Sequence, residues 1–113
     1  MHNQSVWGDT EAWNRMDVEF RTRDLERIAT EAAHRSGFPE AAVVAYRKRL
    51  QVIRAARDER DLYQLKSFRF EKLLGNRSHQ RSIRLNDQWR LILEIRPGTP
   101  GNTVVIVGIE DYH

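Results

Sequence analysis

The sequence predicts a small α+β domain, with two N-terminal helices packed on one face of a mainly antiparallel β-sheet in the order β-α-α-β-β-β. The chain has 113 residues, which suits one compact domain. Its first half carries apolar residues at helical spacing, and its second half changes to a strand-like period of two. Helices that precede such a sheet pack together on one face, so we expect the other face to stay open.

The N-terminal segment, residues 1–15, shows no clear period, whereas residues 16–113 carry the pattern of a single domain. The segment is either an appendage at an often disordered chain end or the result of a start codon assigned too early, with Met16 as the true start. Residues 17–21 alternate apolar and charged side chains, which predicts a short first strand.

Two helices are predicted next. Thr22 is a good N-cap for a helix that extends to about Ser36, and Gly37 suits its left-handed end. Pro39 begins the second helix, where its missing N–H costs nothing, and this helix ends near Arg57. Each helix has one apolar stripe, formed by Leu25, Ile28, Ala29, Ala32 and Ala33 in the first and by Val43, Tyr46, Leu50 and Ile53 in the second.

Three more strands are predicted in the second half. Residues 82–86 and 89–96 alternate apolar and polar side chains on either side of a tight turn at 86–88. Residues 97–102 are rich in proline and glycine and form a strong turn signal. The following run, 103–109, is apolar on both faces, as expected for an internal strand.

The charge distribution favours a polyanionic partner. Nineteen basic residues against sixteen acidic ones give a net charge of only +3. The excess is concentrated in residues 66–96, which hold eight basic residues, mostly arginine, against three acidic ones. Guanidinium groups bind phosphate oxygens through paired hydrogen bonds, so nucleic acid is the first partner to consider.

Several classes of chemistry lack their motifs. The chain has no cysteine, which excludes disulfides, Cys-ligated zinc and iron–sulfur clusters. Phosphate-loop, dinucleotide, hydrolase-elbow and zincin motifs are absent, and the few acids after Glu71 form no obvious cage for two metal ions. We therefore expect no cofactor and no metal. No apolar run approaches the roughly 20 residues of a membrane helix, and no signal pattern is present, so we expect a cytoplasmic protein without a membrane partner.

Two arginines are the first candidate site residues. Arg84 and Arg90 are six residues apart, so they share one sheet face if the loop between their strands has an odd number of residues. With Arg77 and Arg81 just upstream, they can hold one phosphodiester and neutralise charge that develops on it. The alternative interpretation is a solvated strand face on which arginines only provide solubility.

A second candidate group follows the last strand. His113 can transfer protons near neutral pH, Tyr112 can stack on a base, and Asp111 can orient an imidazole or a guanidinium. The alternative interpretation is a frayed chain end without a function.

Three stretches together resemble the HigB toxins of the RelE/ParE superfamily. They are Leu-Leu-Gly-Asn-Arg at 73–77, Arg-Ser-Ile-Arg-Leu-Asn-Asp-Gln-Trp-Arg at 81–90 and Glu-Asp-Tyr-His at 110–113. The likeness covers about residues 16–113 and implies a RelE-like fold. It also implies a type II toxin: an mRNA interferase that cuts messages in the decoding site of the 70S ribosome. A helix-turn-helix, HigA-like antitoxin would inhibit it, and operator DNA would be contacted only through that antitoxin.

The resemblance also implies residue roles. His113 matches a catalytic histidine, Arg84 and Arg90 match arginines that hold the scissile phosphate, and Tyr112 and Asp111 match residues that place the RNA and the histidine. Whether His113 acts as base or acid stays open.

One position departs from the family pattern. Relatives often carry lysine where this chain has Leu74, and Lys72 or Arg77 is the candidate substitute for that missing charge. Together with Arg81, these two residues form the expected phosphate-binding set.

Two other functions stay open at this point. One is a ParE-like poison of DNA gyrase, which binds without cutting RNA. The other is a non-catalytic domain that binds RNA or the ribosome through its basic sheet. Proton-transfer groups beside paired arginines favour the nuclease.

Overall fold

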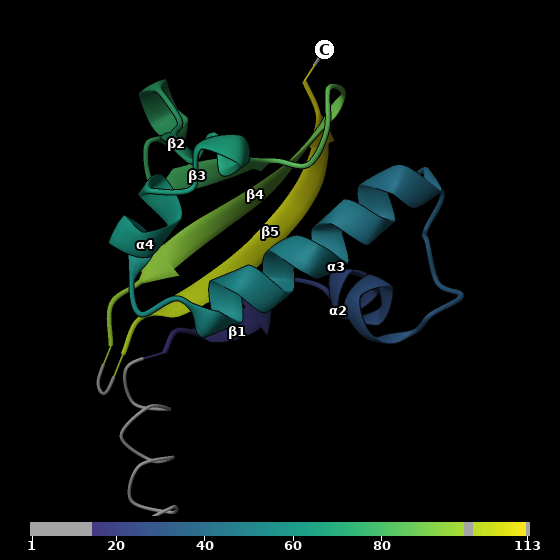
Figure 1. Cartoon of the computed structure of the whole chain (residues 1–113), viewed down its shortest axis with the longest axis horizontal. Helices are drawn as coiled ribbons and strands as arrows, with labels where there is room; N and C mark the ends of the chain where they lie inside the picture. Colours follow the sequence, from purple (N-terminus) through teal and green to yellow (C-terminus); the bar gives the residue numbers. More distant parts are fainter. Residues whose placement is uncertain (1–14, 99–100, 113) are drawn as a thin grey trace, which may run out of the picture.

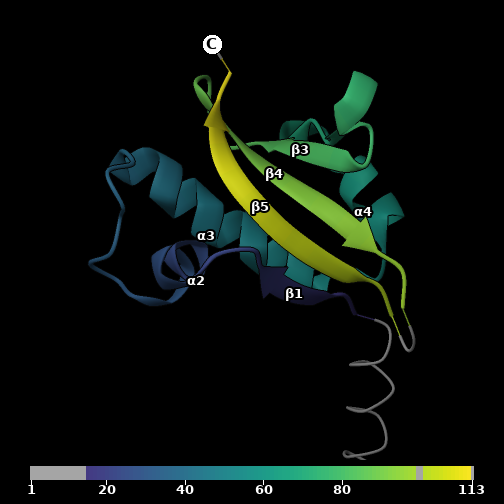
Figure 2. The ribbon, with the colours of Figure 1, turned by 180° about the vertical axis from the view of Figure 1, so that it is seen from behind.

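The protein is described from a computed structural model, which covers residues 15–98 and 101–112. Most of the predicted appendage and the candidate His113 lie outside the described residues. The domain has two layers. Helices α2 (Arg23–Thr30) and α3 (Glu40–Ala55) lie on one side of a five-stranded sheet (Figure 1). None of the described helices lies over the other side of strands β3 to β5 (Figure 2).

The sheet has the order β1-β5-β4-β3-β2. Its strands are β1 (Asp17–Phe20), β2 (Glu71–Lys72), β3 (Gln80–Arg84), β4 (Trp89–Arg96) and β5 (Thr103–Asp111). Strand β1 runs parallel to β5, and all the other pairs are antiparallel. The α+β class and the mainly antiparallel sheet with two helices on one face are therefore confirmed.

The predicted turn between β3 and β4 owes its shape to Asn86. The Oδ1 atom of Asn86 accepts the backbone N–H groups of Gln88, at 2.9 Å, and of Trp89, at 2.8 Å. Asparagine is suited to this role because its short side chain replaces a backbone carbonyl within a turn. The turn brings the ends of β3 and β4 into register, so that Arg84 lies directly opposite Arg90.

Helix α2 begins as predicted but ends early. The hydroxyl of Thr22 accepts the N–H of Leu25, and the helix stops at Thr30 instead of continuing to Ser36. The predicted length was wrong because Arg47 of α3 takes over the backbone carbonyls there. Its guanidinium donates to the carbonyl oxygens of Ile28, Glu31, Ala32 and His34. These bonds hold the segment after the helix against α3 in a non-helical path.

Helix α3 begins after Pro39, as predicted, and provides most of the helical part of the core. Its residues Ala42, Val43, Tyr46, Leu50 and Ile53 are buried. The Tyr46 hydroxyl donates to the carbonyl oxygen of Leu25 at 2.8 Å, so the buried phenol has its hydrogen bond and joins α3 to α2. Met16 is only 2% exposed and belongs to the same core cluster.

The segment between α3 and β3 contains elements that the sequence did not predict. They are helix α4 (Glu59–Tyr63), the 3₁₀ turns η1 (Lys66–Phe68) and η2 (Gly75–Arg77), and strand β2. Each is too short to show a period of its own. Buried Leu62, Phe68 and Phe70 attach this segment to the core. No helix in the described part of the chain is long and apolar enough to cross a membrane.

Candidate functional site

The two candidate arginines share the open face of the sheet. Arg84 of β3 and Arg90 of β4 are direct register partners, so their side chains leave the sheet on the same side. Their neighbours Ile83 and Leu91 belong to the core cluster under the helices. The face predicted from strand alternation is therefore confirmed. Figure 2 views the molecule from this side.

An open pocket of about 370 Å³ lies at the β2–β3 end of this face. It is lined by Arg69, Glu71, Arg84, Asp87 and Tyr112. Two of the sequence-predicted site residues, Arg84 and Tyr112, thus meet in one pocket. The carboxylate of Asp87, in the turn after β3, forms an ion pair with Arg84. The pocket therefore combines cations, carboxylates and one aromatic ring.

Arg90 lies directly beside this pocket. Its guanidinium is over the ring of Tyr112, 5.5 Å from the ring centroid, as in a cation–π contact. One of its terminal nitrogens, Nη2, is 3.4 Å from Oε1 of Glu110. Its Nε is buried without a hydrogen-bond partner among the described residues, so the guanidinium keeps unused donor capacity.

The turn after β3 holds the end of β5 in place. The backbone N–H of Tyr112 donates to the carbonyl oxygen of Gln88 at 2.7 Å. The Gln88 amide nitrogen also donates to Oδ2 of Asp111 at 3.1 Å. Asp111 thus contacts the turn rather than the pocket lining, and Tyr112 is fixed by its backbone beside Arg90.

Glu110 joins two arginines of the open face. Its carboxylate accepts two hydrogen bonds from Arg77, at 2.7 and 3.2 Å, and a longer one from Arg90. The hydrogen bonds from Arg77, followed by the charges of Arg77 and Arg90, lower the pKa of Glu110 against the opposing effect of burial. Arg77 is therefore committed to Glu110 and does not line the pocket.

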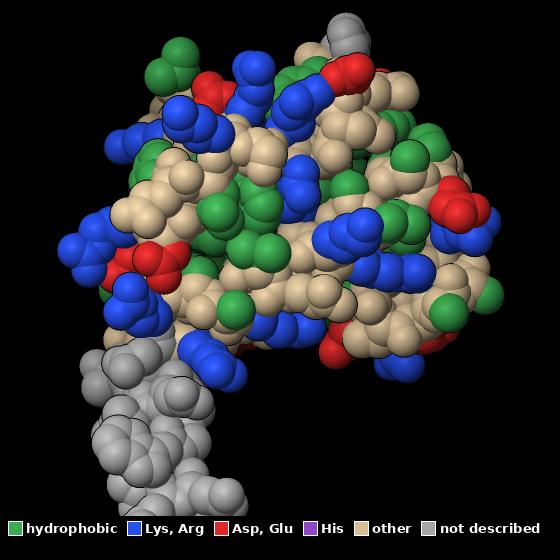
Figure 3. Space-filling view, viewed as in Figure 1, with side chains coloured by type: hydrophobic (Ala, Val, Ile, Leu, Met, Phe, Trp, Pro, Cys, Tyr) green, Lys and Arg blue, Asp and Glu red, His purple; other side chains and the backbone are tan. Residues whose placement is uncertain are grey.

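Arg81 and Lys72 lie on the other face of the sheet. They are register partners, and Arg81 also pairs with Leu93, which belongs to the core cluster. The Nε of Arg81 contacts Glu59 of α4 at 3.4 Å. The structure thus does not bring these two predicted phosphate-binding residues to the pocket. Other Lys and Arg side chains are spread over the helix-bearing side as well (Figure 3).

A sequence model of the HigB-like toxin family, described as the RelE-like toxin of the type II toxin-antitoxin system HigB, matches residues 18–113. The chain belongs to this family. As a HigB-type toxin of the RelE superfamily it has an antitoxin as a partner. The family assignment made from the three sequence stretches is confirmed.

One known relative of this HigB-type chain supports the family assignment, and one solved structure supports the fold. Toxin HigB-1 of Vibrio cholerae serotype O1 is 34% identical over 88 residues, which cover 78% of this chain and 93% of the relative. A solved structure, the YoeB/ParE toxin from Agrobacterium tumefaciens, matches with a TM-score of 0.52. That match covers 87% of this chain and all of the other at 13% identity, and it shows the RelE-like fold alone.

Sequence reasoning missed three pocket residues of the HigB-type chain. Arg69 and Glu71 lie in the segment without a period, just before the first stretch that carries the family resemblance. Asp87 is within the second stretch but was interpreted only as part of a turn. One available signal was the block Phe-Arg-Phe at 68–70, in which a basic residue stands between two aromatic residues.

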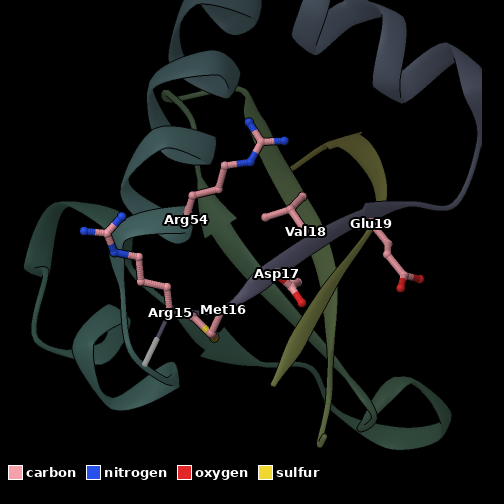
Figure 4. Close-up of a pocket in the computed structure, with 6 residues that line it drawn as sticks. All are labelled: Arg15, Met16, Asp17, Val18, Glu19 and Arg54. Atoms are coloured by element: carbon pink, nitrogen blue, oxygen red, sulfur yellow. The ribbon is translucent and has the colours of Figure 1, made fainter. Parts of the chain in front are cut away.

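A separate pocket lies at the opposite edge of the sheet. It has a volume of about 550 Å³ and is lined by Arg15, Met16, Asp17, Val18, Glu19 and Arg54 (Figure 4). None of the sequence-predicted site residues lines it. Among the described residues, no group of three or more His, Asp or Glu side chains has an arrangement that could hold a metal ion.

Proposed function

We propose that this HigB-type toxin is a ribosome-dependent mRNA interferase, an endoribonuclease that cuts messages in the decoding site and thereby stops translation. The supporting observation is the convergence of Arg84 and Tyr112 in one open pocket, with Arg90 stacked beside the same ring. Arginine binds the phosphate of single-stranded RNA, and an aromatic ring provides a surface on which a base stacks.

The proposed reaction uses the RNA's own 2′-hydroxyl as the nucleophile. The 2′-oxygen forms a bond to the adjacent phosphorus while the bond from phosphorus to the 5′-oxygen breaks. One protein group accepts the 2′-proton, and another protonates the 5′-oxygen. Arg84 and Arg90 offset the charge that develops on the phosphorane. The products are a 2′,3′-cyclic phosphate and a free 5′-hydroxyl. DNA lacks the 2′-hydroxyl and is not cut.

His113 is the principal proton-transfer residue in this proposal, and Glu71 is the second such group. Glu71 lines the pocket, and its carboxylate forms no ion pair or hydrogen bond among the described residues. A carboxylate and an imidazole provide the two titrating groups that general acid–base catalysis of this reaction needs. Asp111 and Tyr112 place the RNA and the histidine.

The His113→Gln variant tests the proposal. We expect it to fold and to bind the antitoxin like the wild type, because none of the buried core residues of the described chain is changed, but to lose toxicity and cleavage. The 5′ ends of transcripts, mapped after a brief induction, measure cleavage directly. Full toxicity of this variant excludes His113 from the mechanism. Intact transcripts under the wild-type toxin, with gyrase supercoiling blocked, indicate a gyrase poison instead.

The proposed partners follow from this reaction. They are the 70S ribosome with its mRNA in the cytoplasm and a helix-turn-helix antitoxin through which the pair contacts operator DNA. Ribosome profiling of cells that express the toxin checks the first of these. We expect footprints to accumulate at the cleaved codons.

A further inference from the structure

Arg69 stands out by its backbone. It adopts φ 45° and ψ 51°, the left-handed conformation that is uncommon for residues with a side chain. The residues on both sides are buried phenylalanines, Phe68 at 4% and Phe70 at 7% exposure. The Arg69 side chain itself is exposed and lines the pocket. Such a conformation persists only where the surroundings impose it, and here the two rings do so.

Both rings have specific neighbours that fix them. The guanidinium of Arg49, from α3, lies 4.5 Å from the centroid of the Phe68 ring. The same Arg49 donates its Nε–H to the carbonyl oxygen of Arg84 at 3.1 Å. Phe70 packs edge-on against Tyr63, with ring centroids 4.6 Å apart. Arg49 thereby connects the Phe68 ring of η1 with the backbone of β3.

Arg69 also differs from the neighbouring arginines in its charge environment. Arg84 is paired with Asp87, and Arg77 and Arg90 are paired with Glu110. The Arg69 backbone N–H donates to the carbonyl oxygen of Lys66, but its guanidinium has no ion pair or hydrogen bond among the described residues. An incoming anion has to compete with a carboxylate at each of the other three positions. At Arg69 it meets a guanidinium without such competition.

We propose that Arg69 is a further phosphate-binding residue of this site and contacts the backbone of the RNA strand that lies over Tyr112 and Arg84. This inference rests on the proposed function. A glycine at this position would satisfy the left-handed backbone without strain. The arginine therefore contributes through its guanidinium, which is held at the pocket by the two buried rings.

The Arg69→Gly variant separates this role from folding. Glycine relieves the backbone strain, so we expect the thermal midpoint to stay constant or to rise. Loss of a charged hydrogen bond to phosphate predicts a rise in KM for ribosome-bound message of about tenfold or more. We expect kcat to change less than about twofold, since Arg84 and Arg90 remain. Arg69→Lys keeps the charge and recovers part of the KM effect.

Arg54→Ala is the matched control. Arg54 is exposed on α3, lines the pocket at the opposite sheet edge and has no ion-pair partner among the described residues. Its loss removes the same unit of charge, so KM stays close to the wild-type value if the effect belongs to the Arg69 position. A KM for Arg69→Gly equal to that of the wild type overturns the inference. A lowered thermal midpoint for that variant transfers the decision to Arg69→Asn, because asparagine tolerates the left-handed backbone but carries no charge, and a wild-type KM for Arg69→Asn likewise overturns the inference.

A binding experiment keeps this inference distinct from the proposed function. Inorganic phosphate and a 2′-deoxy dinucleotide, which cannot be cleaved, are titrated into the isotope-labelled full chain. We expect the Arg69 Nε–Hε signal to shift with both probes in the wild type. A wild-type protein that cleaves messages but leaves this signal unchanged contradicts the inference alone. A wild-type protein that shows the shift but cleaves no message contradicts the proposed function alone.

Discussion

Glu110 explains how two like charges can stand side by side on the open face. Arg84 and Arg90 are opposite each other on neighbouring strands, an arrangement that is unfavourable for like charges. On the other side of Arg90, β5 places Glu110 as its register partner. The carboxylate offsets the charge of Arg90 and binds Arg77, while Asp87 offsets that of Arg84. The positive charge of Arg84 and Arg90 is therefore partly offset in the free protein.

The lowered pKa of Glu110 predicts a pH-dependent contribution to stability. A carboxyl whose pKa is lower in the folded than in the unfolded state stabilises the fold above its ordinary value of 4.5. This contribution is lost as the pH falls through the folded-state pKa. We expect Glu110→Gln to lower the free energy of unfolding at pH 7 by about 1 kcal/mol or less, because the pair is partly exposed to solvent. Urea denaturation at pH 7 and at pH 3 measures it.

The test of this prediction is the effect of Glu110→Gln on the free energy of unfolding, compared between the two pH values. The difference between Glu110→Gln and the wild type should shrink as the pH falls from 7 toward 3, because the wild-type carboxyl takes up a proton as the pH passes through its lowered pKa. Glu19→Gln removes an exposed carboxylate at the other end of the face and serves as the control. An equal difference for Glu110→Gln at both pH values would show that its packing, and not its charge, matters.

Arg84 and Arg90 are expected to act on the reaction itself. Truncation of either residue to alanine removes stabilisation of the phosphorane charge and should reduce cleavage on the order of 10²-fold or more. Single-turnover cleavage of ribosome-bound message measures this effect. Arg96, which pairs with Glu19 away from the pocket, is the matched control on β4. Equal activity of all three alanine variants would favour the interpretation of a solvated strand face.

Individual site residues differ in how far the sequence predicts them. Arg84 and Arg90 follow from strand alternation, because a side-chain period of two fixes the face of every residue. Because β3 begins at Gln80, the same rule also applies to Arg81 and places it on the helix-bearing face. The sequence prediction had instead grouped Arg81 with Arg84 because the two are close in sequence. Arg69 depends on a left-handed backbone between two buried rings, which no period indicates.

At the level of elements, the early end of α2 shows how one side chain overrides helical spacing. The apolar stripe through Ala32 and Ala33 predicted a longer helix. Arg47 instead donates hydrogen bonds to the backbone carbonyl oxygens of four residues in this segment, at positions 28, 31, 32 and 34. A helical continuation would have to use those carbonyls itself. Such competition between distant residues is invisible to a local pattern.

Arg47→Ala tests this account of the element. Loss of the guanidinium leaves the carbonyls of residues 28–34 to water, and we expect a loss of about 1 to 2 kcal/mol in the free energy of unfolding. Hydrogen exchange of the amides in residues 31–37 should accelerate, whereas exchange within α3 should change little. The neighbouring Lys48→Ala is the control. Unchanged exchange in residues 31–37 would show that other contacts hold the segment.

The strands and helices were predictable where they are long enough to repeat a period. Strands β3, β4 and β5 and helix α3 lie close to their expected ranges for this reason. Strand β2 has two residues and α4 has five, so neither offers a repeat. The pocket is partly built from this unpredicted segment, which is why two of its five lining residues, Arg69 and Glu71, were missed.

For the whole molecule, the sequence predicted the helix layer and the sheet layer but not the order of the strands within the sheet. A predominance of antiparallel pairs followed from the consecutive strands in the second half. The parallel pairing of β1 with β5 required knowledge of which distant segments meet. The open face followed from the number and position of the helices, since two helices cover only one side of a sheet of this size.

The pairing of β1 with β5 has a consequence for when the toxin becomes dangerous to the cell that makes it. Among the described strands, β1 is synthesised first and β5 last, yet they are neighbours in the sheet. While β5 is still inside the ribosomal exit tunnel, β1 lacks the strand to which it hydrogen-bonds, and the pocket lacks Tyr112. The sheet and the pocket therefore form only after β5 has left the tunnel, so the toxin cannot act before all of its described strands have been synthesised.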